Sequence, residues 1–249
     1  MSLTVLLLTF VPTLVWCVIW LWVKPTTVAL RWLAAGIALG VLAAVPIWFY
    51  ESAVDALADP NKRWSRVFIQ QVLGAAVGEE GFKMLGVGIL LAIVGRFMAL
   101  QPRTVVAMAI SVGIGFMTLE NLFGVTVAES PMVLALNRQM TIIAGHGCYQ
   151  AIMGCLLAKA IQDRRFSWGV LAFVVPVILH GWGDFSDQLF KDEPDPGSAE
   201  DTFLFYTWIA SILTTAIATG LLLWHVRMQW NTPETSADSE NPESSSEEA

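Results

Sequence analysis

Residues 78–83 carry three ionisable side chains inside an apolar run, 67–95, that is long enough to cross a bilayer. The three are Glu79, Glu80 and Lys83. A charge at membrane depth is costly unless it is paired or faces water, so such residues mark candidate functional sites. On a helix, Lys83 lies between the two glutamates and can pair with either. Two carboxylates and one ammonium leave one negative charge, whose partner must come from elsewhere in the chain.

Three later apolar runs also contain ionisable or amide side chains. Counted from the middle of each run at about 1.5 Å per residue, the two glutamates of the first run and Glu120, His146 and His180 of the later ones fall within about 7 Å of the bilayer midplane and on the same side of it. The sequence therefore predicts one layer of carboxyl and imidazole groups, formed by four successive helices. The later groups are Glu120 and Asn121 in 104–127, His146 in 139–161, and His180 with Asp184, one helical turn apart, in 166–190.

The composition indicates that these helices lie in a membrane. Of 249 residues, 55% are hydrophobic and only 14% are charged, which indicates an integral, multi-pass membrane protein in a lipid bilayer. We expect an all-α, polytopic transmembrane helix bundle of about seven spans. They are 3–23, 29–50, 67–95, 104–127, 139–161, 166–190 and 203–225.

The chain is expected to form one helical domain, 1–230, with its motif core at 78–185 and an acidic, disordered tail at 231–249. The basic residues other than Lys83 divide eight to five between the two sides, so the positive-inside rule predicts an external N-terminus and a cytoplasmic C-terminus. The sequence has no basic patch, so we expect no nucleic-acid partner. Its three cysteines make no disulfide framework.

Each polar group also has a purely structural interpretation. Lys83 is most simply the counter-ion of Glu79 or Glu80, and a lone intramembrane Glu or His often only bonds two helices together. Asn121 serves equally well as a link between helices or as a substrate contact. A functional site is favoured by the complete set, because carboxylates and two histidines occur on four spans at matched depth.

At these residues the sequence resembles the PrsW family of intramembrane proteases, which is related to the CAAX prenyl protease and bacteriocin-processing superfamily. Four motifs in the family's order and spacing, covering about 78–185, make the resemblance specific. They are Glu79-Glu80-x-x-Lys83, Phe116-x-x-x-Glu120-Asn121, Arg138 followed by His146 and Gly154, and His180-x-x-x-Asp184-Phe185.

The resemblance implies a glutamate-dependent endopeptidase that cleaves membrane-associated protein or peptide substrates. The best-known members act on anti-sigma factors in stress signalling, by a site-1-type cleavage in a bacterial or archaeal cell membrane. Carried over to this chain, one glutamate of the first motif activates water and the other holds Lys83. We assign the base to Glu79, although the sequence does not separate it from Glu80.

The remaining motif residues take supporting roles by the same resemblance. His180 with Asp184 is expected to donate to the developing oxyanion, and His146 to orient water or substrate. Glu120 shares in positioning the water. Phe116, Asn121, Arg138 and Lys83 are expected around this group as substrate contacts or supporting residues.

Zinc is the main mechanistic alternative. Two histidines and a glutamate match a catalytic zinc site with another glutamate as base, and the ligands would be Glu120, His146 and His180. The chain has no HExxH motif, and these ligands come from separate helices. We therefore expect a site without a metal cofactor.

Two other classes of protein could place similar groups in a membrane. A proton-coupled transporter lines its cavity with Glu, Asp, His and Lys, but the polar groups here cluster in spans three to six without a matching set in an inverted repeat. A non-catalytic scaffold is the other alternative, since the scaffold subunit of gamma-secretase is a superfamily relative. The intact Glu79-Glu80 pair together with Glu120 favours an enzyme.

Overall fold

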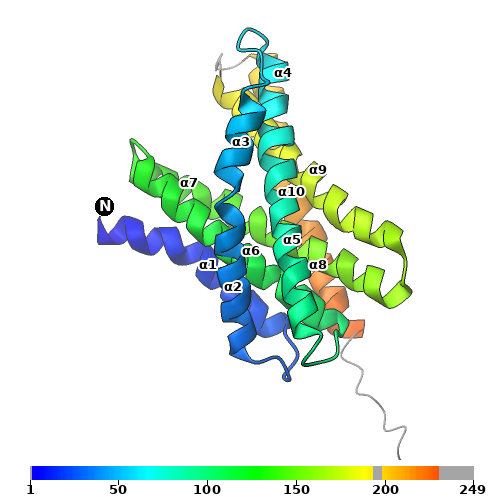
Figure 1. The fold of residues 1–249 in the computed structure, drawn as a ribbon. Coiled ribbons are helices and arrows are strands. Elements are labelled where there is room, and N and C mark those ends of the chain that lie inside the picture. The colour runs from blue at the N-terminus through cyan, green and yellow to red at the C-terminus, as the bar shows by residue number, and fades with distance from the viewer. Residues whose placement is uncertain (1, 193–197, 230–249) are drawn as a thin grey trace, which may run out of the picture.

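The computed structural model describes residues 2–192 and 198–229, and all regular structure in these ranges is helical (Figure 1). This confirms the predicted all-α class. Five helices are long and apolar enough to cross a membrane, and the predicted acidic tail, 231–249, lies outside the described residues. The five are α1 (Leu3–Val23), α2 continued by α3 (Leu30–Asp55), α6 (Pro102–Val127), α9 (Phe166–Asp192) and α10 (Ala199–Gln229).

The other helices carry several of the polar groups on which the site depends. One continuous helical segment contains α4 (Arg63–Val67), the π-helix η1 (Phe68–Ala76) and α5 (Val77–Val94). The shorter helices α7 (Pro131–Ile143) and α8 (His146–Asp163) follow α6.

Two predicted spans are broken. The run 139–161 was predicted as one helix, but α7 ends before Gly145 and α8 starts at His146. Glycine is a poor helix former, and Gly145 and Gly147 flank His146, so the helix is weakest at this point. The predicted span 29–50 is interrupted at Pro46, which has no N–H to donate. It is divided into α2 (Leu30–Ala44) and α3 (Ile47–Asp55).

Helix α6 forms the centre of the bundle and packs against α1, α2, α5, α7 and α8. Its backbone touches that of α2, where glycines permit the close approach. A Cβ atom added to Gly115 would lie 2.0 Å from the carbonyl oxygen of Ile37, and one added to Gly40 would lie 2.0 Å from that of Val112. Small residues at such crossings are the usual means by which membrane helices approach.

Helix α3 anchors the segment that leads into the first motif. The Tyr50 hydroxyl donates to the carbonyl oxygen of Leu73 in η1 at 3.0 Å, and the Tyr50 ring lies against Gly78 at the start of α5. In Figure 1, α2 and α3 run beside α5 and η1, with α1 and α7 together on one side and α8 and α9 together on the other. A π-helix widens the turn and often occurs near a functional site. Here it directly precedes the two glutamates.

Candidate active site

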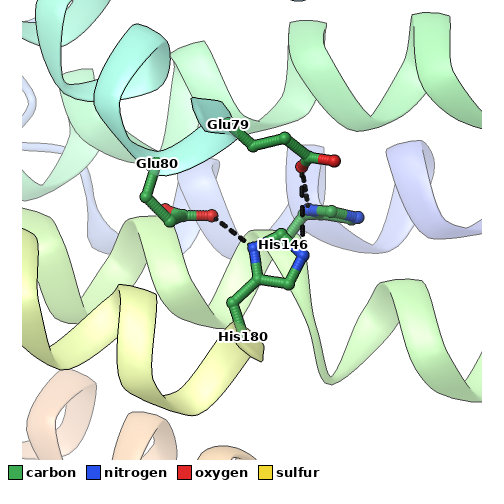
Figure 2. A group of neighbouring side chains, drawn as sticks. All are labelled: Glu79, Glu80, His146 and His180. Atoms are coloured by element: carbon green, nitrogen blue, oxygen red, sulfur yellow. Dashed lines mark hydrogen bonds and ion pairs between the residues drawn. The ribbon is translucent and has the colours of Figure 1, made fainter. Parts of the chain in front are cut away.

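Helices α5, α8 and α9 bring four motif side chains into one group, Glu79, Glu80, His146 and His180 (Figure 2). Each offers a ligand atom, and these atoms lie within 4.8 Å of one another. All four side chains are buried. Carboxyl and imidazole groups from three of the four predicted helices are therefore close together here.

Lys83 lies at the centre of this group and is fully buried. Its Nζ atom donates to Glu79 Oε2 at 3.0 Å and to Glu80 Oε1 at 2.8 Å, so it pairs with both glutamates. It also lies 3.0 Å from His146 Nδ1 and 4.1 Å from the centre of the Phe116 ring. Because an ammonium can only donate, this contact requires an unprotonated Nδ1 on His146.

Glu80 is enclosed by hydrogen-bond donors and has no exposed surface. Besides Lys83, His180 Nδ1 lies 3.0 Å from Glu80 Oε1, and Gln150 Nε2 donates to Glu80 Oε2 at 3.0 Å. Both carboxylate oxygens are thus occupied by protein groups. Such a carboxylate holds its neighbours in place but is not accessible to a substrate.

Glu79 has different surroundings. Its Oε2 atom contacts Lys83 and lies 3.5 Å from His146 Nδ1 and 4.0 Å from His180 Nε2. Among the described residues, none bonds its other oxygen, which points away from the group in Figure 2. Glu79 therefore touches both histidines and retains a free oxygen.

His180 is held between two carboxylates. Its Nδ1 faces Glu80 at 3.0 Å, and its Nε2 faces Asp184 Oδ2 at 2.9 Å, so the predicted pairing with Asp184 is present. The Glu80 and Asp184 oxygens can both accept a hydrogen bond from His180 only if both nitrogens of its ring carry protons. The geometry therefore fits a positively charged imidazolium at His180.

Glu120 and Arg138 lie on the opposite side of His146. Glu120 Oε2 is 2.8 Å from His146 Nε2, so the ring lies between this carboxylate and Lys83. Arg138 Nη1 lies 3.3 Å from both Glu120 Oε1 and the Glu120 carbonyl oxygen. Helix α7 thus supplies the cation that fixes Glu120.

Asn121 lies apart from this group. Its Nδ2 atom donates to the carbonyl oxygen of Thr9 at 2.6 Å and ties α6 to α1. Of the two roles that the sequence left open for Asn121, this contact is the structural one.

A cavity of about 810 Å³ adjoins the buried group. Glu79 contributes to its wall, and Glu80 does not. Carboxylates from α3 and from the end of α9 also line it. Motif residues and their neighbours in the wall are Glu79, Glu120, Arg138, His146, Tyr149, His180, Gly183 and Asp184.

Two residues of this site were not among the predicted site residues. Gln150 bonds Glu80, and Tyr149 stacks on His180 in the cavity wall. Both follow His146 by about one turn of α8, so their side chains lie near its face of the helix. A buried amide in that position was the available signal for Gln150, whereas an aromatic residue in an apolar helix is most often part of the core.

Comparison with known proteins identifies one family for most of the chain. Residues 28–229 match the model of the PrsW family of intramembrane metalloproteases. A protein named Protease PrsW, from Shouchella clausii (strain KSM-K16), is 28% identical over 109 residues, which are 43% of this chain and 49% of that protein. The match thus spans about half the length of the curated relative. No solved structure gives a significant match.

Proposed function

The chain belongs to the PrsW family of intramembrane metalloproteases, and from this premise we propose that it hydrolyses peptide bonds of membrane-associated proteins at the cavity beside Glu79. Peptide hydrolysis needs a base for the attacking water, positive charge for the oxyanion and a proton for the leaving amine. The groups around the cavity can supply all three.

Glu79 is the proposed general base. The observation that carries this assignment is that Glu79 touches both histidines and lines the cavity, whereas Glu80 is enclosed. A base must reach the proton that it removes, directly or through one water. Glu79 takes the proton of a water molecule in the cavity, and that water attacks the peptide carbonyl carbon.

The balance of charge supports the same role. Four carboxylates, Glu79, Glu80, Glu120 and Asp184, face two permanent cations, Lys83 and Arg138. An imidazolium at His180 supplies a third positive charge, and one negative charge remains. Glu79 has a carboxylate oxygen without a protein partner among the described residues, so the remaining negative charge is available there.

His180 is the proposed source of positive charge and of the proton for the leaving amine. Asp184 bonds its Nε2 atom at the cavity wall, and Glu80 fixes the ring from Nδ1. Charge-assisted donors in a site removed from bulk water are worth more than the same donors in water. Asp184 keeps the imidazole oriented and charged.

A divalent metal ion is the second candidate, favoured by the donor set and by the family's description. Glu79, His146 and His180, with Glu80, would hold it, in place of the predicted zinc set that included Glu120. Such an ion would make a bound water a stronger nucleophile and polarise the carbonyl. Lys83 contacts three of these side chains, so its ammonium must move before an ion shares the same atoms.

The proposed substrates are single-pass membrane proteins, with anti-sigma factors as the first class to test. The proposed location is a bacterial or archaeal cell membrane. The proposals of anti-sigma factors as substrates and of a bacterial or archaeal membrane rest on the family resemblance. The cavity supports the entry of a polypeptide segment at the site.

The experiment that tests the function uses the full chain in detergent with a single-pass test substrate in water enriched in ¹⁸O. We expect cleavage with one ¹⁸O atom in the new carboxyl terminus, detected by mass spectrometry of the products. The same reaction with a strong chelator separates the two candidates. Retained cleavage supports the glutamate mechanism, and loss that zinc restores supports the metal. An intact substrate with every buffer and metal addition would contradict the proposed function.

A further inference from the structure

The hydroxyl group of Tyr149 has no hydrogen-bond partner among the described residues, although the residue is only 7% exposed. Tyr149 lies in the wall of the cavity. Buried tyrosine hydroxyls usually bond to a protein group or an ordered molecule. The partner of this hydroxyl is therefore to be sought among molecules that enter the cavity.

The position of the hydroxyl is fixed by the two histidines. The Tyr149 ring stacks on His180, with centroids 4.9 Å apart and an angle of 19° between the rings. It meets His146 edge-on, with centroids 6.2 Å apart and an angle of 84°. A ring held on two sides directs its hydroxyl without a further tether. The polar tip thus belongs to the same rigid group as the proposed catalytic residues.

The space beside the hydroxyl is kept open by Gly183. A Cβ atom added to Gly183 would lie 3.6 Å from Tyr149 Oη and 3.4 Å from Ser211 Oγ. Ser211 donates to the carbonyl oxygen of Trp208 within its own helix, so its proton is already used. Of the two hydroxyls at this wall, Tyr149 is the one with a proton to offer a ligand.

We propose that the Tyr149 hydroxyl donates a hydrogen bond to the carbonyl oxygen of the scissile peptide and stabilises the oxyanion that forms there. The inference rests on the proposed function of the site. A separate donor is useful here because the proposed mechanism assigns the Nε2 proton of His180, which lies against Asp184 at 2.9 Å before cleavage, to the leaving amine. A phenol beside an imidazolium supplies the oxyanion with a neutral donor next to a positive charge.

The test is the Tyr149→Phe variant of the full chain, because phenylalanine keeps the ring and the stacking on His180. Loss of one oxyanion donor lowers kcat by about 100-fold or more. We expect this loss with KM changed less than about twofold, since the bond strengthens only as the oxyanion develops. Tyr206→Phe is the matched control, because Tyr206 is 65% exposed and outside the cavity wall. It should cleave like the wild type.

A second experiment tests the role of the hydroxyl even if Tyr149→Phe alters folding. Incorporation of 3-fluorotyrosine and 3,5-difluorotyrosine at position 149 keeps the shape and makes the hydroxyl progressively more acidic. A donor to the oxyanion makes kcat vary with that acidity, whereas a structural hydroxyl leaves kcat constant. Wild-type kcat in Tyr149→Phe, or constant kcat in the fluorinated series, overturns the inference but not the proposed function. A wild-type chain that cleaves no substrate overturns both.

Discussion

Glu79 and Glu80 are consecutive residues with different surroundings: Glu79 lines the cavity, and Glu80 has both carboxylate oxygens bonded by buried protein groups. The two glutamates therefore have different roles in this charged site. Glu80 neutralises Lys83 and His180, and Glu79 remains accessible for chemistry. Removing the charge of Glu79 should therefore have a different effect from removing the charge of Glu80.

Glu80→Gln should destabilise the protein more than Glu79→Gln. The glutamine amide carries no charge, so the buried ammonium of Lys83 and the ring of His180 lose the negative partner that Glu80 provides. Removing one partner of a buried ion pair lowers the stability of a protein by about 3–5 kcal/mol. Unfolding of both variants in detergent micelles, followed by circular dichroism, measures the difference. Glu200→Gln is the control, because its pair with Arg63 is exposed and worth at most about 1 kcal/mol. Equal loss of stability in Glu79→Gln and Glu80→Gln would count against the division of roles.

The sequence predicted the group of charges because each one stands out in an apolar run, and helical geometry places residues at matched depths. It did not separate Glu79 from Glu80, because periodicity within one helix does not determine its rotation against its neighbours. The break between α7 and α8 was missed for a related reason, since hydropathy continues across Gly145 while the helix does not. The consequence is that His146 begins a helix.

Lys83→Met should raise the affinity of the site for a divalent cation at least tenfold, about 1.4 kcal/mol. The Lys83 ammonium lies within 3.0 Å of Glu79, Glu80 and His146, and methionine removes that competing charge at similar size. Titration of the purified protein with Zn²⁺ in a calorimeter gives the affinity, independently of activity. Lys159→Met is the control, since Lys159 pairs with Asp163 and neither residue lines the cavity. Unchanged Zn²⁺ affinity in Lys83→Met would show that the ammonium and the ion do not compete.

Gly115→Ala should destabilise the bundle by about 1–3 kcal/mol or more, because the added Cβ atom would lie 2.0 Å from the Ile37 carbonyl oxygen. The obstacle is backbone, so α2 and α6 must separate to make room. Gly220→Ala is the control, because a Cβ atom there meets nothing within 4 Å. Thermal unfolding of both variants in one detergent checks the prediction. A Gly115→Ala variant as stable as Gly220→Ala would contradict the close approach of α2 and α6.

The most direct test of the account is the rate of cleavage by Glu79→Gln under single-turnover conditions. Removing the general base should lower the rate by about 10² to 10⁴-fold and leave the fold intact. Glu200→Gln is the control, because Glu200 is exposed and outside the cavity wall, and this variant should cleave at the wild-type rate. A folded Glu79→Gln variant that cleaves at the wild-type rate would contradict the central claim that the Glu79 carboxylate activates the attacking water.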